Sequence, residues 1–308
     1  MTVVFAAVAP VFLLIVAGYL LRRFVARDDV YWNRAEWVVY YVLFPTLFAV
    51  TLARADFTSV PAGGVGVALG TGVLAMSAIC LTLRPVLAAF LGTDGPAFTS
   101  VFQGATRWQT SVALAVAATL FGDPGLALGA VAVLAMTPLL NVMNVWVLAR
   151  YAAPDARGWR SVAVAIGKNP FILGCALGLL INVTRLPIPQ PLFDVATALG
   201  RAALIMGVLT VGAGLRLGAL ARLRTVTWLA AALKLVVMPA TAIGLGAAFG
   251  MRGTNLAVIA CCASVPSTSS AYVLARQMGG DAPLMAEIIT VQTLFAVVTM
   301  PIAIGLAS

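Results

Sequence analysis

Histidine is absent from this chain of 308 residues, and charged residues make up only 9% of it. Without histidine the chain lacks the commonest metal ligand and the usual proton-relay group, which argues against zinc, haem and histidine-based chemistry. A soluble domain needs roughly a quarter charged residues to solvate its surface. Because 62% of this chain is hydrophobic, a bilayer must cover most of its exterior.

Cysteine is also scarce, and nothing in its placement indicates a metal site or a cofactor. All four cysteines fall inside apolar segments without metal-ligand spacing: Cys80, Cys175, Cys261 and Cys262. We therefore expect small buried side chains and no bound metal.

The net charge of +9 does not indicate a nucleic-acid partner. Phosphate backbones are bound by lysine and arginine clustered on a solvated face. Here the basic residues lie in short gaps between apolar runs, where they set orientation in a membrane. The expected surroundings are membrane lipid.

Apolar stretches of about 20 residues, the length that crosses a bilayer, recur along the whole chain. They predict an all-α polytopic membrane protein with ten spans, at about 3–21, 36–53, 62–83, 97–121, 125–149, 162–182, 193–214, 226–249, 254–278 and 282–306.

The lysines and arginines collect on one side of these spans, which predicts the orientation. The side expected to face the cytoplasm carries Arg22, Arg23, Arg27, Arg34, Arg84, Arg150, Arg157, Arg160, Lys168, Arg216, Arg222, Arg224 and Arg276. The other side carries only Arg54, Arg185 and Arg252. We expect a multi-pass protein of a bacterial inner membrane with both termini on the periplasmic side.

The two halves of the chain, 1–153 and 154–308, resemble each other. APVFLLIVAGYLL from Ala9 aligns with NPFILGCALGLLI from Asn169, so that Pro10 matches Pro170 and Gly18 matches Gly178. Because each half holds five spans, the second must enter the membrane from the opposite side. Such inverted repeats are typical of secondary transporters, although apolar sequences also match by chance.

Spans four and nine occupy matching places in the two halves, and both contain polar runs that suit a lipid-facing helix poorly. These residues are Gln103, Gly104, Thr106 to Ser111, Ser264 and Pro266 to Ser270. Pro266 removes a helix hydrogen bond, which predicts a broken helix whose half-helix N-termini favour an anion. The alternative is a proline kink with hydroxyl packing between helices.

Arg107 lies near the middle of span four. A central arginine costs on the order of 3 kcal/mol to insert, so it normally faces a cavity or a partner. Its guanidinium suits a substrate carboxylate. A structural bond to carbonyls of an unwound helix is the alternative.

Gln103, Lys234 and Glu287 are the candidates for coupling or gating, because they are further polar or charged residues within the spans. Lys234 and Glu287 lie at similar depth and are expected either to pair or to act separately. Glu287 would then carry a coupling proton, and Lys234 would extend its ammonium to the interface.

The most informative segments resemble the auxin efflux carrier family of the bile acid/auxin carrier superfamily. The resemblance rests on SVPSTSSAYVLARQMGGDAPLMAEIITVQT from Ser264 and RWQTSVALAVAATLFGDPG from Arg107. It extends over essentially the whole chain, which is similar to the short bacterial form.

The resemblance implies two inverted five-helix repeats with broken, crossing helices four and nine. Scaffold helices one, two, six and seven would cover about 3–53 and 162–214, and transport helices about 62–149 and 226–306. A small organic anion, elevator movement and a homodimer through the scaffold are implied. The matching substrate-binding positions are Arg107, Gln109, Thr110, Pro266, Ser267 and Thr268, with Gln109 where the family commonly has asparagine. No cofactor is implied beyond a coupling proton or sodium ion.

Three other functions remain open from the sequence. A sodium- or proton-coupled cation exchanger shares this architecture, but cation sites usually gather several oxygen ligands, and Glu287 is the lone acidic candidate. A membrane-embedded enzyme needs an activated nucleophile with partners, and we expect none here, because the Ser267–Ser270 cluster has no histidine and no carboxylate near it in sequence. A sensor without transport is the third.

Overall fold

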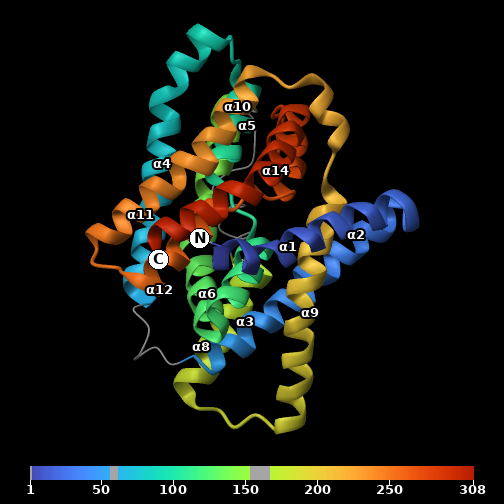
Figure 1. The fold of residues 1–308 in the computed structure, drawn as a ribbon, viewed down its shortest axis with the longest axis vertical. Helices are drawn as coiled ribbons and strands as arrows, with labels where there is room; N and C mark the ends of the chain where they lie inside the picture. Colours follow the sequence, from blue (N-terminus) through green and yellow to red (C-terminus); the bar gives the residue numbers. More distant parts are fainter. Residues whose placement is uncertain (1, 56–61, 153–166) are drawn as a thin grey trace.

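The computed structural model describes residues 2–55, 62–152 and 167–308 (Figure 1), and these residues form helices connected by short turns. The first half contains α1 (Thr2–Leu20), η1 (Leu21–Val25), α2 (Asp29–Val38), η2 (Val39–Leu43), α3 (Phe44–Ala53), α4 (Ala62–Leu91), α5 (Gly95–Thr106) and α6 (Thr110–Tyr151). The second half contains α8 (Pro170–Thr184), α9 (Gln190–Gly214), η3 (Leu217–Arg222), α10 (Thr225–Ala232), η4 (Leu233–Val237), α11 (Met238–Ala248), α12 (Gly253–Ser264), α13 (Ser270–Gln277) and α14 (Ala282–Ala307). The predicted start of span six at 162, the boundary at 153–154, Arg157 and Arg160 lie outside the described residues.

Seven helical stretches among the described residues are long and apolar enough to cross a membrane. The stretch Gly95–Tyr151, 57 residues long, contains both predicted spans four and five. Predicted spans six and nine correspond to the shorter apolar helices Pro170–Thr184 and Gly253–Ser264. The polytopic all-α class is therefore confirmed, whereas the number ten and the inverted repeat stay predictions.

The outer surface is apolar, as a lipid-facing surface must be. Leu13, Phe90, Val183 and Leu306 are large hydrophobic side chains that lie exposed on four different helices. The same helices bury their opposite faces in a continuous core. Because lipid covers this apolar exterior, the chain does not need the many charged residues that solvate the surface of a soluble protein.

The helices form two groups (Figure 1). In one group α3 packs against α8 and α9, and α1 packs against α9. In the other group α4 packs against α6 and α11, and α12 lies against α6, α11 and α14. The groups meet where α6 contacts α1, α3, α8 and α9, and where α14 contacts α1.

Two π-helical turns, η2 and η4, occur just before prolines. Pro45 and Pro239 each follow a π turn by two residues. A proline lacks its N–H and its ring clashes with the carbonyl four residues earlier, and a wider turn relieves that clash. Tyr40 lies in η2, and Lys234 lies in η4.

Candidate functional site

The first feature of the site is the break between α5 and α6. The helix ends at Thr106, and Arg107 has extended backbone torsions of φ −67° and ψ 155°. Gln109 is also extended, at φ −92° and ψ 94°, before α6 begins at Thr110. The polar run of span four is therefore an interruption of the helix, as the sequence predicts.

The second feature is an equivalent break between α12 and α13. Val265, which follows α12, has torsions of φ −67° and ψ 151°, nearly those of Arg107. Both α5 and α12 are 12 residues long, and their residue numbers differ by 158 at both ends. By this offset Gln109 corresponds to Ser267 and Thr110 to Thr268.

Hydrogen bonds join the two breaks through Ser267 and Gln292. The Ser267 hydroxyl donates to the Gly104 carbonyl at 2.6 Å, and its backbone N–H donates to Gln292 Oε1 at 2.9 Å. Gln292 Nε2 donates to the carbonyls of Gly104 at 3.0 Å and Ala230 at 3.2 Å. Ser267, buried to 2% exposure, thus satisfies backbone groups that the breaks leave unpaired.

We expect Gln292→Leu to lower the free energy of unfolding by about 2–3 kcal/mol, because the buried Ser267 N–H loses its acceptor. Chemical or thermal unfolding in detergent measures the change. Gln190→Leu is the control, since Gln190 is an exposed residue whose amide bonds Asp194. Equal stability of the two variants would contradict the role given to Gln292.

A cavity of about 440 Å³ adjoins the crossing of the two breaks. Of the predicted site residues, Arg107, Gln109, Thr110 and Thr268 line it, together with Glu36, Tyr40, Asn141, Asn169, Thr210, Ser269 and Ser270. Pro266 and Ser267 are absent from this lining, and Ser267 bonds the crossing instead.

Glu36, Tyr40 and Thr210 are among the lining residues that come from the other group of helices, and the sequence did not single them out. Each lies in or beside an ordinary apolar span. Of the three, only Glu36 could have been suspected from the sequence, because it is an acidic residue at the start of predicted span two. The positions of Tyr40 and Thr210 depend on helix packing and leave no trace in the sequence.

The Arg107 side chain is only partly engaged. One terminal nitrogen, Nη1, donates to Ser270 Oγ at 3.3 Å, and the buried Nε has no partner within the described residues. Ser270 Oγ in turn donates to Thr268 Oγ1 at 3.3 Å. Because a guanidinium has five N–H donors, most of them remain available at the cavity.

A second cavity, of about 360 Å³, continues the first toward the arginine-rich end of the molecule. The two share Glu36, Thr210, Ser269 and Val273 in their linings. The second is also lined by Arg22, Arg216 and Arg276. A further cavity, beside Arg54, Asp123 and Arg201, shares no lining residue with the first.

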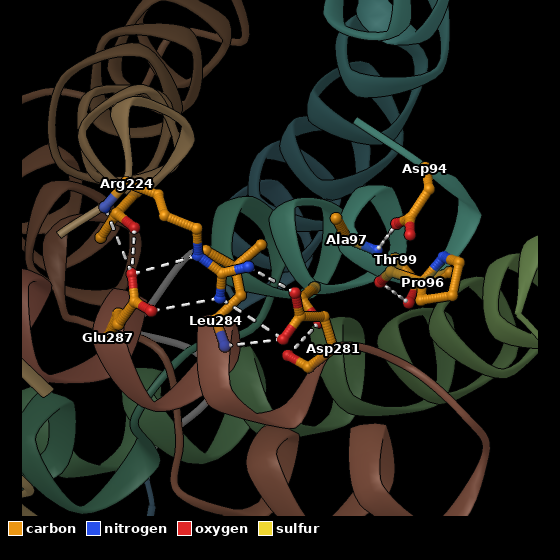
Figure 2. A network of polar contacts seen from close by, with 10 residues as sticks. Asp94, Pro96, Ala97, Thr99, Arg224, Asp281, Leu284 and Glu287 are labelled. Carbon is orange, nitrogen blue, oxygen red and sulfur yellow. Dashed lines mark hydrogen bonds and ion pairs between the residues drawn. The ribbon is translucent and has the colours of Figure 1, made fainter. Parts of the chain in front are cut away.

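At the arginine-rich end, Arg224 lies between two carboxylates (Figure 2). It is 2.6 Å from Asp281 and 3.1 Å from Glu287, which also accepts from Thr227 at 2.9 Å. Burial alone would lower the pKa of the Arg224 guanidinium, but its hydrogen bonds and charge contacts with both carboxylates raise it. The predicted alternative that Glu287 pairs with Lys234 is wrong, because Arg224 occupies that carboxylate.

The same network connects three helix starts. Asp281 caps α14 by accepting from Leu284 N, its N–H donates to Pro96, and its carbonyl accepts from Ser100 Oγ at 2.8 Å. Arg224 precedes α10. The starts of α5, α10 and α14 are therefore held together.

Lys234 and Gln103 are fully buried, at 0% exposure. Neither the Lys234 ammonium nor the Gln103 amide has a hydrogen-bond partner within the described residues. The expectation that Lys234 extends to the interface is therefore wrong: the π turn directs it inward, toward the helices that pack on η4. These helices include α5, α12 and α14.

Among the described residues, no three histidine, cysteine, aspartate or glutamate side chains lie close enough together to hold a metal ion. The site consists of hydroxyls, amides, one arginine and one glutamate. Such groups bind a polar organic ligand through hydrogen bonds and charge.

The fold and the site define the chain as a polytopic membrane protein with a polar cavity at two interrupted helices. A family model described as membrane transport protein matches residues 159–304. This match covers most of the second half of the chain and confirms the predicted resemblance to the auxin efflux carrier family. A search of curated proteins gave no match.

Proposed function

We propose that the chain is a secondary transporter that moves a small organic anion, most simply a carboxylate, across the inner membrane. The observation that carries this proposal is the partly engaged Arg107 guanidinium at a cavity of about 440 Å³ between two broken helices. Discontinuous helices at corresponding positions mark the substrate site in many transporters.

Charge at the cavity favours a ligand with one carboxylate. Arg107 offers a fork of donors, and the α6 N-terminus at Thr110 adds unpaired N–H groups with a partial positive charge. Glu36, where the two cavities join, repels a second negative charge. A monocarboxylate with hydroxyl or amino groups therefore fits better than a compact dianion.

The proposed mechanism is an elevator movement of one helix group against the other. The scaffold would comprise α1–α3, α8 and α9, and the transport unit α4–α6 and α10–α14. Two observations support this division: the packing of the helices in two groups, and the network that joins α5, α10 and α14. The constant offset of 158 residues between the breaks supports the inverted repeat of five spans each.

The proposed state of the described structure is open to the cytoplasm, with both termini periplasmic. The substrate cavity continues into the cavity lined by Arg22, Arg216 and Arg276, on the side where positive residues predominate. Exposed apolar residues on α8 and α9, such as Leu177 and Val195, offer a surface for the proposed scaffold dimer. Gln103 and Lys234 remain the proposed positions for coupling to a proton or sodium ion.

Counterflow in proteoliposomes tests the proposed function. Vesicles loaded with an unlabelled carboxylate should accumulate the same labelled carboxylate, and a panel of monocarboxylates, dicarboxylates and amino acids identifies the class. A sodium gradient applied without organic solute is the control for the rival cation exchanger. Proton flux in that control, with no counterflow of any acid, would overturn the anion proposal.

A further inference from the structure

A fourth cavity lies at the arginine-rich end between the first helix and the end of α9, beside the second cavity, with which it shares Arg22, Asp29 and Arg216. Its volume is about 570 Å³, and its lining includes Arg22, Arg23, Arg27, Asp29, Arg216 and Leu217. Four arginines and one acidic residue line it. This excess of positive charge indicates an anionic ligand.

The four arginines are not equally engaged. Arg22 pairs with Asp29 at 2.7 Å, and Arg216 donates to the Tyr272 hydroxyl at 3.2 Å while stacking over its ring. The side chains of Arg23 and Arg27 are exposed and have neither an ion pair nor a hydrogen bond within the described part of the chain. Arg23 and Arg27 therefore carry the uncompensated charge of this cavity.

Apolar side chains beside these arginines are exposed, as they are on the rest of the apolar outer surface. Phe24 is 64% and Val25 is 75% exposed, and both lie at the end of an apolar stretch of 22 residues, Val4–Val25. Tyr31, on the next helix, is 53% exposed, as expected of an aromatic residue at a membrane interface. Charge and apolar surface thus meet at the level where phospholipid headgroups adjoin acyl chains.

We infer that this cavity binds the headgroup of an anionic phospholipid. The lipid phosphate would accept hydrogen bonds from Arg23, Arg27 and Arg216, and the acyl chains would lie along Phe24, Val25 and Leu217. Arginine forks suit phosphate oxygens, and basic pockets at the ends of membrane helices bind anionic headgroups. A soluble phosphate has the same charge but makes no use of the apolar surface, which favours the lipid.

Titration of the detergent-purified protein with two lipids of identical acyl chains tests the site. Phosphatidylglycerol should raise the unfolding temperature at concentrations where phosphatidylcholine, glycerol 3-phosphate and inorganic phosphate do not. Arg23→Gln/Arg27→Gln should weaken phosphatidylglycerol binding roughly 25-fold, since each arginine near the surface contributes about fivefold. Because this experiment measures lipid binding, its result does not depend on the result of the transport assay.

Arg185→Gln/Arg252→Gln is the matched control, because both residues are exposed on the opposite predicted face and should leave lipid affinity unchanged. Arg23→Lys/Arg27→Lys keeps the charge and should retain most of the affinity, even where the glutamine pair folds poorly. Equal stabilisation by both lipids, equal weakening in the control pair, or equal protection by soluble phosphate would each overturn the lipid site.

Discussion

Arg107→Ala is expected to reduce carboxylate transport by about two to three orders of magnitude in kcat/KM. A carboxylate held by a partly desolvated guanidinium loses about 3–4 kcal/mol when that partner is removed, and each 1.4 kcal/mol is tenfold. Arg107→Lys should recover only part of the loss, because an ammonium is a point charge and cannot form the paired bonds of a guanidinium. Initial rates of labelled uptake in proteoliposomes measure the effect.

Two controls separate the Arg107 site from general electrostatics. Arg276→Ala removes a charge from the adjoining cavity and should lower the rate only severalfold, an effect that salt diminishes. Arg185→Ala, far from both cavities, should change nothing. Retention of full activity by Arg107→Ala in correctly folded protein would remove the central support of the proposed function.

Gly18→Ala and Gly212→Ala are each expected to lower the free energy of unfolding by about 2–3 kcal/mol, with a larger loss for the pair. These glycines bring α1 and α9 together: a Cβ at Gly18 would overlap the Leu209 carbonyl, and one at Gly212 the Ile15 carbonyl. Because the obstructing atoms are backbone, the helices must separate, and overpacking of this kind costs about 1–3 kcal/mol or more. Unfolding in detergent with added denaturant measures the loss.

Gly244→Ala is the matched control for these two variants. Gly244 also lies within a helix, α11, but a Cβ there would meet no atom within 4 Å. Its replacement should be neutral or stabilise by up to about 1 kcal/mol, since alanine favours helix over glycine. Destabilisation of Gly244→Ala as large as that of Gly18→Ala would show that helix contact is not the cause.

The breaks in spans four and nine could be predicted from the sequence because their cause is local. A proline and a run of hydroxyls and amides at mid-span disfavour a continuous lipid-facing helix, whatever the rest of the chain does. Arg107 could be identified for the same reason, since a charge at that depth needs a cavity or a partner. The structure places Arg107 at both: it lines the cavity and bonds Ser270.

The partners of the other intramembrane residues could not be predicted, because they depend on contacts between distant segments. The sequence predicts similar depths for Lys234 and Glu287, but Glu287 bonds Arg224 and Thr227, 63 and 60 residues away along the chain. Ser267 resembles a ligand-binding hydroxyl in sequence, yet the crossing directs its oxygen to the Gly104 carbonyl. Gln292, an amide on α14, holds both breaks together through bonds to Ser267 and Gly104.

The sequence by itself determined that a bilayer surrounds this protein, that its fold is all-helical, and where two of its helices are interrupted. Each of these follows from the chemistry of a short segment: apolar length requires a bilayer, and proline with polar residues interrupts a helix within it. Only the tertiary structure decided which side chains face the cavity, because Glu36, Tyr40 and Thr210 reach it through the packing of α2, η2 and α9. The close approach of α1 and α9 likewise rests on Gly18 and Gly212, whose effect depends on the backbone that they meet across the interface.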